Sequence, residues 1–280
     1  MNIVTFVVMA KKNGKGTMTF WEHLEELRWH LIRSIVAVLL LAISAFLARD
    51  ILFDQILLAP SSSAFITHRL FCQLSAYLNS PGMCLNNIDL KIINIALSGQ
   101  FIAHMYISIM AGLILAFPYI LWEFWRFIKP ALLPVEKKHS RGAVVMASSL
   151  FYLGLLFSYF LIVPLTITFL GTYQVSLNVE NQIALRSYIN TVMSLSFAVG
   201  LVFELPIVVY FLTKIGVLTP HLMKNGRKIA LILILLISAI ITPADIFSMI
   251  MVAIPLYLLF EISITISARA SRKISLPDAV

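Results

Sequence analysis

Charged residues are scarce in this sequence. Only 12% of its 280 residues are Asp, Glu, Lys or Arg, whereas 60% are hydrophobic and the mean hydropathy is +0.94. A soluble domain carries about twice that share of charge, so the composition argues against one and favours a protein that crosses a membrane several times. The net charge of +8 is then informative through its distribution across the membrane, and it does not indicate a nucleic-acid partner.

Cysteine is rare, and the common catalytic motifs are missing. Two cysteines cannot build a disulfide framework or a zinc site, and the six histidines show no metal-ligand spacing. The sequence contains no His-Glu-x-x-His, no Gly-x-Ser-x-Gly and no Walker loop. Gly14-Lys15-Gly16-Thr17 resembles a phosphate loop only faintly, because no strand precedes it. We therefore expect no enzyme activity, no cofactor and no metal site.

Long apolar segments are what the sequence does contain. They cover about residues 31–47, 101–121, 143–170, 188–212, 229–241 and 246–266. A helix needs about 20 residues to cross a bilayer, and the fifth segment has only 13. Thr242-Pro243-Ala244-Asp245 joins it to the sixth, which predicts a short hairpin with a structural turn at Pro243 and Asp245.

Proline shapes the predicted bundle. Pro118, Pro164, Pro206 and Pro255 lie inside the apolar segments, and each is expected to kink its helix. The predicted fold is an all-α polytopic membrane protein with six transmembrane helices in a kinked, concave bundle. It consists of a mobile basic tail at 1–18, a single membrane domain at 19–267 and a short tail at 268–280.

The lysines and arginines predict the orientation in the membrane. Seventeen of the 21 fall on one side of the predicted helices, and the other side has only Arg49, Arg69, Lys91 and Arg186. The positive-inside rule then places both termini in the cytoplasm. The outside loop, 49–100, is too long for a simple connector, and its apolar periodicity predicts short capping helices. It holds Cys72 and Cys84, for which a disulfide and two unlinked thiols both remain open.

A polar segment precedes the first span: Phe20-Trp21-Glu22-His23-Leu24-Glu25-Glu26-Leu27-Arg28. It predicts a helix in which an apolar stripe runs beside a polar face that carries His23, Glu26 and His30. From the residues alone, two interpretations stand. The segment is an interfacial lead-in to the first span, or it is a docking surface that offers carboxylates to a cationic partner.

Two carboxylates interrupt the apolar segments. Glu261 lies near the cytoplasmic end of the sixth, where reaching the interface explains it. Glu204 lies deeper and next to Pro206. An intramembrane carboxylate normally faces protein or water, so Glu204 either bonds to the backbone that the proline frees or has a functional role.

Five groups of residues, taken in order, resemble the TatC family, the integral receptor subunit of the twin-arginine protein translocase. They are His23-Leu24-Glu25-Glu26-Leu27-Arg28, Phe127-Ile128-Lys129-Pro130-Ala131-Leu132 with Glu136-Lys137-Lys138, Phe203-Glu204-Leu205-Pro206, Ile241-Thr242-Pro243-Ala244-Asp245, and Ala253-Ile254-Pro255-Leu256-Tyr257. The resemblance runs from about Phe20 to Ser267. The chain departs from the family at His30, where many members have a basic residue, and at Pro134 and Val135, which replace polar residues.

The resemblance implies a glove-shaped receptor that binds the twin-arginine signal peptides of folded proteins at its cytoplasmic face. It also implies that the proton-motive force drives transport. Planar carboxylates are the best acceptors for two adjacent guanidinium groups. The residues expected to bind the peptide are Glu26 and Glu136, with Glu25 as a third acceptor, Arg28 from the same motif, and Phe127 and Trp125 against its apolar part.

The resemblance also implies partners and a location. They are single-span proteins of the TatA and TatB types, further copies of the chain, and the inner membrane of a bacterium. Glu204 would contact a partner helix there. The alternative is a secondary transporter with Glu204 as its coupling-ion site, although Phe117-Pro118-Tyr119-Ile120 and Leu205-Pro206-Ile207-Val208 echo each other too weakly for a typical inverted repeat.

Overall fold

The computed structural model describes residues 20–78, 90–128, 140–176, 178–243 and 245–274. Its elements in chain order are α1 (Phe20–Leu47), η2 (Ile51–Leu57), η3 (Ala59–Ser61), α2 (Ile66–Tyr77), β1 (Ile92–Ile93), α3 (Gly99–Ile128), α5 (Ser140–Phe157), η6 (Ser158–Ile162), α6 (Val163–Thr172), β2 (Ile183–Ala184), α7 (Leu185–Val202), α8 (Leu205–Lys214), α9 (Pro220–Asn225), α10 (Arg227–Ile241) and α11 (Ile246–Ile274). The expected basic tail at 1–18, Glu136 and Cys84 lie outside the described residues.

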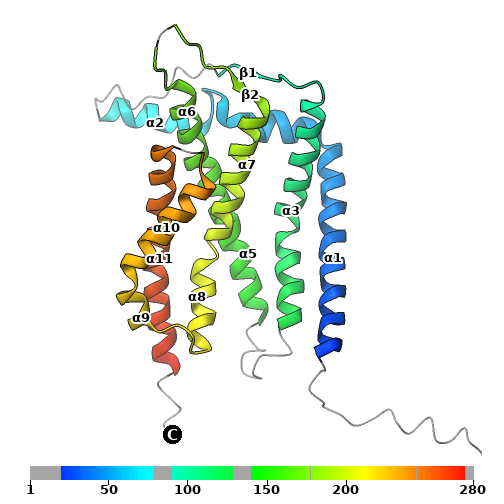
Figure 1. Cartoon of the computed structure of the whole chain (residues 1–280), viewed down its shortest axis with the longest axis vertical. Helices are drawn as coiled ribbons and strands as arrows, with labels where there is room; N and C mark the ends of the chain where they lie inside the picture. The colour runs from blue at the N-terminus through cyan, green and yellow to red at the C-terminus, as the bar shows by residue number, and fades with distance from the viewer. Residues whose placement is uncertain (1–19, 79–89, 129–139, 177, 244, 275–280) are drawn as a thin grey trace, which may run out of the picture.

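The helices run side by side as the apolar segments predict. Within the described residues, five helices or helix pairs are long and apolar enough to cross a membrane, and the 15-residue α10 makes the sixth, shorter pass. Figure 1 shows α1 and α3 at one edge of the bundle and α9, α10 and α11 at the other. Helix α1 begins and α11 ends at the same end of the bundle (Figure 1), which the positive-inside rule identifies as the cytoplasmic end. The predicted all-helical membrane fold is confirmed.

Proline interrupts two of the passes. The third changes from α5 into the π-helix η6 and resumes as α6, with Pro164 in the first turn of α6. The fourth breaks at Phe203 and Glu204, and Pro206 lies in the first turn of α8. A proline tolerates that position because the first helical N–H groups have no partner within the helix. Pro118 and Pro255, by contrast, lie inside the continuous helices α3 and α11.

Helix α1 packs closely along α3, and a glycine permits the contact. A Cβ atom at Gly112 of α3 would lie 2.6 Å from the backbone nitrogen of Ala42 and 2.7 Å from the carbonyl oxygen of Val38, both in α1. Those distances are far below van der Waals contact, so any larger residue would push the helices apart. The contact fixes which residues of α1 and α3 face each other near the cytoplasmic end.

The outside loop forms a cap tied to the third and fourth passes, and its described residues include the expected short helices. The Tyr188 hydroxyl donates to the carbonyl oxygen of Leu57 at 2.8 Å, and the Tyr159 hydroxyl donates to that of Ile56 at 2.6 Å. Strand β1 pairs in parallel with β2, with Ile92 opposite Ile183. Cys72 on α2 is disulfide-bonded, and Cys84 is the only other cysteine of the chain.

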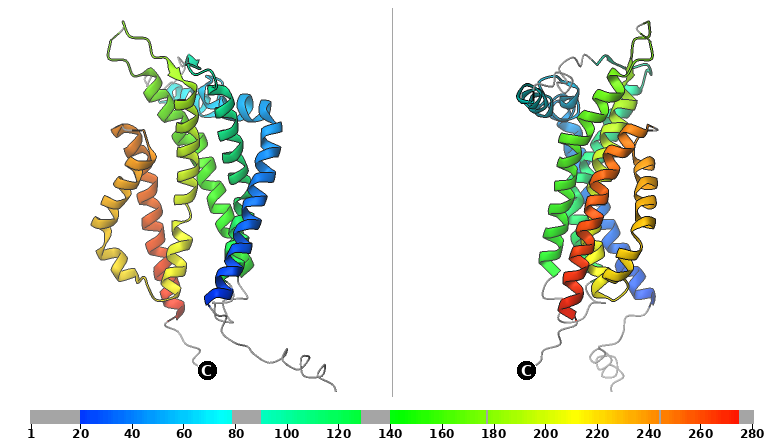
Figure 2. Two further views of the ribbon diagram at one scale, coloured as in Figure 1. Left: turned by 45° about the vertical axis from the view of Figure 1, so that its right-hand side comes forward. Right: turned by 90° about the vertical axis from the view of Figure 1, so that its left-hand side faces the viewer.

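The last two passes form the short hairpin that the sequence predicts. At about 1.5 Å per residue, α10 spans about 22 Å, less than the hydrocarbon core of a typical bilayer. Figure 2 shows α10 beside α11, joined by a tight turn at the end away from α9. Helix α11 continues to Ile274, so the described chain remains helical beyond Ser267, where a tail was expected to begin.

Candidate functional site

A buried carboxylate lies where α1 and α3 pack together at their cytoplasmic ends. Glu123 of α3 is only 3% exposed, although it sits in an aromatic stretch near the membrane boundary. The Tyr119 hydroxyl, one turn earlier on α3, donates to Glu123 Oε1 at 2.9 Å. His30 of α1 contacts Glu123 Oε2 through its ring nitrogen Nδ1. Arg33 lies near enough to attract the same carboxylate, so Glu123 has electrostatic partners from both helices.

His30 links this carboxylate to the predicted recognition segment. Its other ring nitrogen, Nε2, lies 3.9 Å from Glu26 Oε1, one turn earlier on α1. The residue is 6% exposed, and its ring meets the ring of Phe127 edge-on at a centroid distance of 6.1 Å. The sequence predicted His30 on a polar face with His23 and Glu26, and it did not predict that the ring is buried where α3 packs against α1.

Glu26 remains accessible on one side. Its side chain is 33% exposed, whereas its Oε2 atom is buried and has no hydrogen-bond partner among the described residues. A carboxylate accepts several hydrogen bonds, so Glu26 keeps acceptor capacity that the described protein leaves unused. Glu25 and Arg28 are exposed on the same helix. The geometry therefore brings one predicted carboxylate to a partly open position beside a buried cluster.

The other predicted binding residues divide between two environments. Phe127 is half-buried beside His30. Trp125 packs its ring against Phe211 of α8 at a centroid distance of 4.8 Å, so it joins α3 to the fourth pass. Glu136 lies outside the described residues.

Sequence reasoning missed Glu123 and Tyr119. Both lie in or beside the second apolar segment, where they read as residues at the membrane interface. A signal was nevertheless present, because a tyrosine and a carboxylate at positions i and i+4 share one helix face. Their partner His30 is 93 residues away in the sequence, and no local pattern predicts that contact.

Glu204 has a very different environment from Glu123. It is the residue before α8, it is half-buried, and its Oε1 atom is buried with no hydrogen-bond partner among the described residues. The carbonyl oxygen of Glu204 accepts hydrogen bonds from the backbone nitrogens of Ile207 and Val208. Backbone hydrogen bonds therefore stabilise the break between α7 and α8. The side chain makes no described bond to the backbone freed by Pro206, which weakens the purely structural explanation.

The final hairpin is stabilised by local polar contacts at both ends. At its turn, the Asp245 side chain accepts a hydrogen bond from the Ser248 backbone nitrogen at 2.6 Å and so caps α11. At its open end, Arg227 of α10 donates to Glu261 of α11 at 2.8 Å. Glu261 therefore does not merely reach the interface, because it joins the two helices. Pro243 precedes the cap in the turn.

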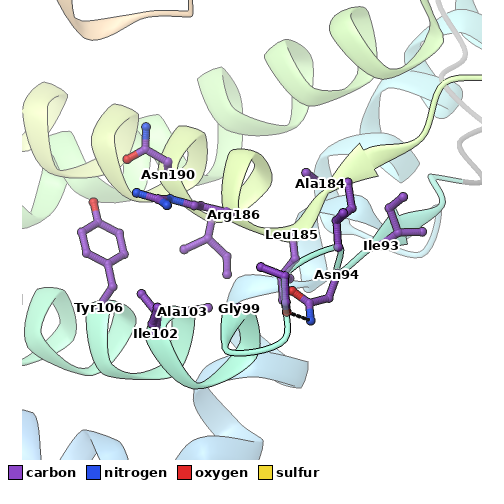
Figure 3. A pocket seen from close by; sticks show the side chains of 13 residues that line it. Ile93, Asn94, Gly99, Ile102, Ala103, Tyr106, Ala184, Leu185, Arg186 and Asn190 are labelled. Atoms are coloured by element: carbon purple, nitrogen blue, oxygen red, sulfur yellow. Dashed lines mark hydrogen bonds between the residues drawn. The ribbon is translucent and has the colours of Figure 1, made fainter.

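A cavity of about 300 Å³ lies between α3, α7 and the paired strands, far from the cluster of His30, Tyr119 and Glu123 (Figure 3). Figure 3 shows Tyr106, Arg186 and Asn190 around an otherwise largely apolar lining. Tyr106 and Glu123 are 17 residues apart on one helix, or about 25 Å at 1.5 Å per residue. The cavity is therefore separate from the carboxylates. Within the described residues, no group of His, Cys, Asp or Glu is arranged to hold a metal ion.

Known proteins resemble this chain along nearly its whole length. Residues 22–255 match the family described as Sec-independent protein translocase protein (TatC). The protein of that name from Blattabacterium is 42% identical over 264 residues, covering 94% of this chain and 99% of the relative. The one from Aquifex aeolicus is 36% identical over 257 residues, covering 91% and 97%. A crystal structure of the twin-arginine translocase receptor TatC superposes with a TM-score of 0.72 at 35% identity, covering 88% of this chain and 99% of that chain.

Proposed function

Because this chain belongs to the TatC family of Sec-independent protein translocase proteins, we propose that it is the receptor subunit of a twin-arginine translocase. In this role it binds twin-arginine signal peptides of folded proteins at its cytoplasmic end. The family match over most of the chain favours a receptor over a secondary transporter, and the six-pass helical fold agrees with it.

The observation that carries the site is the environment of Glu26. Its side chain is partly exposed at the cytoplasmic end of α1, and its buried Oε2 atom has no hydrogen-bond partner among the described residues. A guanidinium group supplies parallel N–H donors that suit such a carboxylate. We infer that Glu26 takes one arginine of the pair and Glu136 the other, with Glu25 as a nearby acceptor. Phe127 and Trp125 would contact the apolar part of the peptide.

The proposed receptor acts in the bacterial inner membrane with single-span partners of the TatA and TatB types and with further copies of itself. Glu204 is the proposed partner contact. Its buried oxygen lacks a donor among the described residues, and a polar group on a partner helix would supply one. We infer transport driven by the proton-motive force, with no chemical step on this chain.

Binding of a labelled twin-arginine peptide tests the proposed site. A charge-assisted hydrogen bond contributes about 1.5–3 kcal/mol, so losing one weakens binding by about ten- to hundredfold. We expect that loss in Glu26→Ala and in Glu136→Ala, measured by peptide cross-linking to membranes. Glu25→Ala is the matched control and should lose less, and a twin-lysine peptide should bind weakly to the native chain. Unchanged cross-linking in both Glu26→Ala and Glu136→Ala would remove the site from these residues.

A further inference from the structure

His30 lies between two carboxylates, and each of its ring nitrogens faces one of them. Nδ1 contacts the buried Glu123, and Nε2 lies 3.9 Å from the partly exposed Glu26. Among the described residues, the other charged or titratable groups that act on Glu123 or Tyr119 are Arg33 from α1 and Arg126 from α3, and Tyr119 itself bonds to Glu123. The ring is 6% exposed, so it cannot turn freely into solvent.

The hydrogen-bonding capacity of imidazole makes this arrangement sensitive to charge. An ionised carboxylate only accepts hydrogen bonds, and a neutral imidazole has one N–H and one lone pair. Only the protonated ring therefore offers a donor to both Glu26 and Glu123. In the neutral ring that donates to Glu123, a lone pair faces Glu26, and the contact through Nε2 becomes unfavourable.

An arginine bound at Glu26 would change which form of the ring is favoured. The guanidinium group would take over acceptor sites on the same carboxylate and place a second positive charge beside His30. Like charges at such short range repel, and the repulsion is stronger near the membrane boundary than in bulk water. The neutral ring avoids this repulsion, and Glu123 and Tyr119 still hold it in place through Nδ1.

We propose that His30 is a positioning residue that couples capture of an arginine at Glu26 to loss of a proton from its ring. When the ring is protonated, it is a built-in counter-ion beside Glu26. Peptide binding displaces its proton, so affinity rises with pH. This inference rests on the proposed function, and it adds a regulation of the same site.

Binding affinity measured as a function of pH tests the coupling. The probe is a labelled, amino-terminally acetylated twin-arginine peptide without His, Asp or Glu, so that the peptide itself does not titrate between pH 6 and 8. Binding linked to one proton changes by at most about tenfold per pH unit. For the native chain in nanodiscs, we expect binding that is about fourfold tighter at pH 8 than at pH 6.

Two substitutions at His30 keep the test sound if one of them fails to fold. His30→Gln is neutral at every pH, and His30→Arg is permanently cationic, so both should give pH-independent affinity. His221→Gln is the matched control, because His221 is exposed on α9 and should leave the slope unchanged. Glu123→Gln retains hydrogen bonding to Tyr119 and His30 without the charge, and it should move the midpoint of the pH dependence.

The outcomes separate this inference from the proposed function. Affinity that is independent of pH in the native chain, or a slope that persists in His30→Arg or His30→Gln, overturns the coupling and leaves the receptor function standing. Full binding by Glu26→Ala overturns the coupling, because the arginine is then not captured at Glu26. Equal binding of twin-arginine and twin-lysine peptides overturns both the coupling and the proposed function. A slope that disappears only with His30 substitutions supports the coupling.

Discussion

Glu123 and Glu204 are both carboxylates inside helical membrane passes, yet their surroundings are opposite. Glu123 is bonded by Tyr119 from its own helix and by His30 from another. Glu204 lies at a helix break, and one of its oxygens is buried without a partner among the described residues. The difference teaches that burial alone does not assign a role. A carboxylate with internal partners orders the protein, and one with unused capacity is a better candidate for an external contact.

The largest expected effect is on the satisfied carboxylate. Glu123→Ala leaves His30 buried without the carboxylate that its Nδ1 atom contacts. Breaking a buried ion pair costs about 3–5 kcal/mol. We expect the free energy of unfolding in detergent to fall by that amount. The double variant His30→Leu with Glu123→Leu should recover most of it, because an apolar pair replaces the buried charges. If Glu123→Ala unfolds like the native chain, Glu123 is not the internally bonded carboxylate described above.

The packing that buries Glu123 can be broken without touching the cluster. Gly112→Ala places a Cβ atom against the backbone of α1, where neither side can move away easily. Overpacking costs about 1–3 kcal/mol, and we expect an equal loss of stability in thermal unfolding. It should be accompanied by weaker peptide binding, because His30 and Glu26 lose their register with α3. Gly142→Ala is the control, since no atom of the described residues lies within 4 Å of a Cβ atom there.

Glu261 provides an intermediate case that sharpens the comparison. Its ion pair with Arg227 is partly open to solvent, with side chains 32% and 49% exposed. Exposed pairs of this kind contribute about 0.2–1 kcal/mol. Arg227→Gln should therefore lower the unfolding free energy by no more than that. Lys228→Gln, which removes the neighbouring positive charge from α10, is the matched control. A loss comparable to that of Glu123→Ala would mean that solvent exposure does not rank these carboxylates.

The smallest effect on stability is expected at Glu204. Glu204→Gln and Glu204→Ala should each change the unfolding free energy by less than about 1 kcal/mol, because no described internal bond is lost. Function should separate them. Gln keeps the size and most of the hydrogen bonding and should retain transport, whereas Ala should lose recruitment of a TatA-type partner with peptide binding intact. Loss of folded protein in both variants would restore the structural explanation.

Much of the fold was predictable because the hydrophobic effect and the bilayer act on local sequence. Apolar run length gave the six passes and the short α10, while the outside loop and the Asp245 turn followed from local residue patterns. Glu26 was predictable as a site residue because it belongs to a short motif. The role of Glu26 in binding remains a prediction.

His30 shows why the remaining features were not predictable. Its burial depends on the close approach of α1 and α3, which Gly112 permits from 82 residues further along the chain. Seen in sequence, His30 and Glu123 were two interfacial polar residues in different segments. Only their packing places them in contact.

The sequence by itself determined that this protein crosses a membrane six times, which end is cytoplasmic, and which family it belongs to. These properties depend on run length, charge distribution and short motifs, all of which are local. The tertiary structure alone decided that both oxygens of Glu123 have partners and that His30 connects Glu123 to Glu26. It also decided that one oxygen of Glu204 is buried without a partner among the described residues. Hydrogen bonds between distant residues depend on distances of a few ångströms, and only packing of the helices sets those distances.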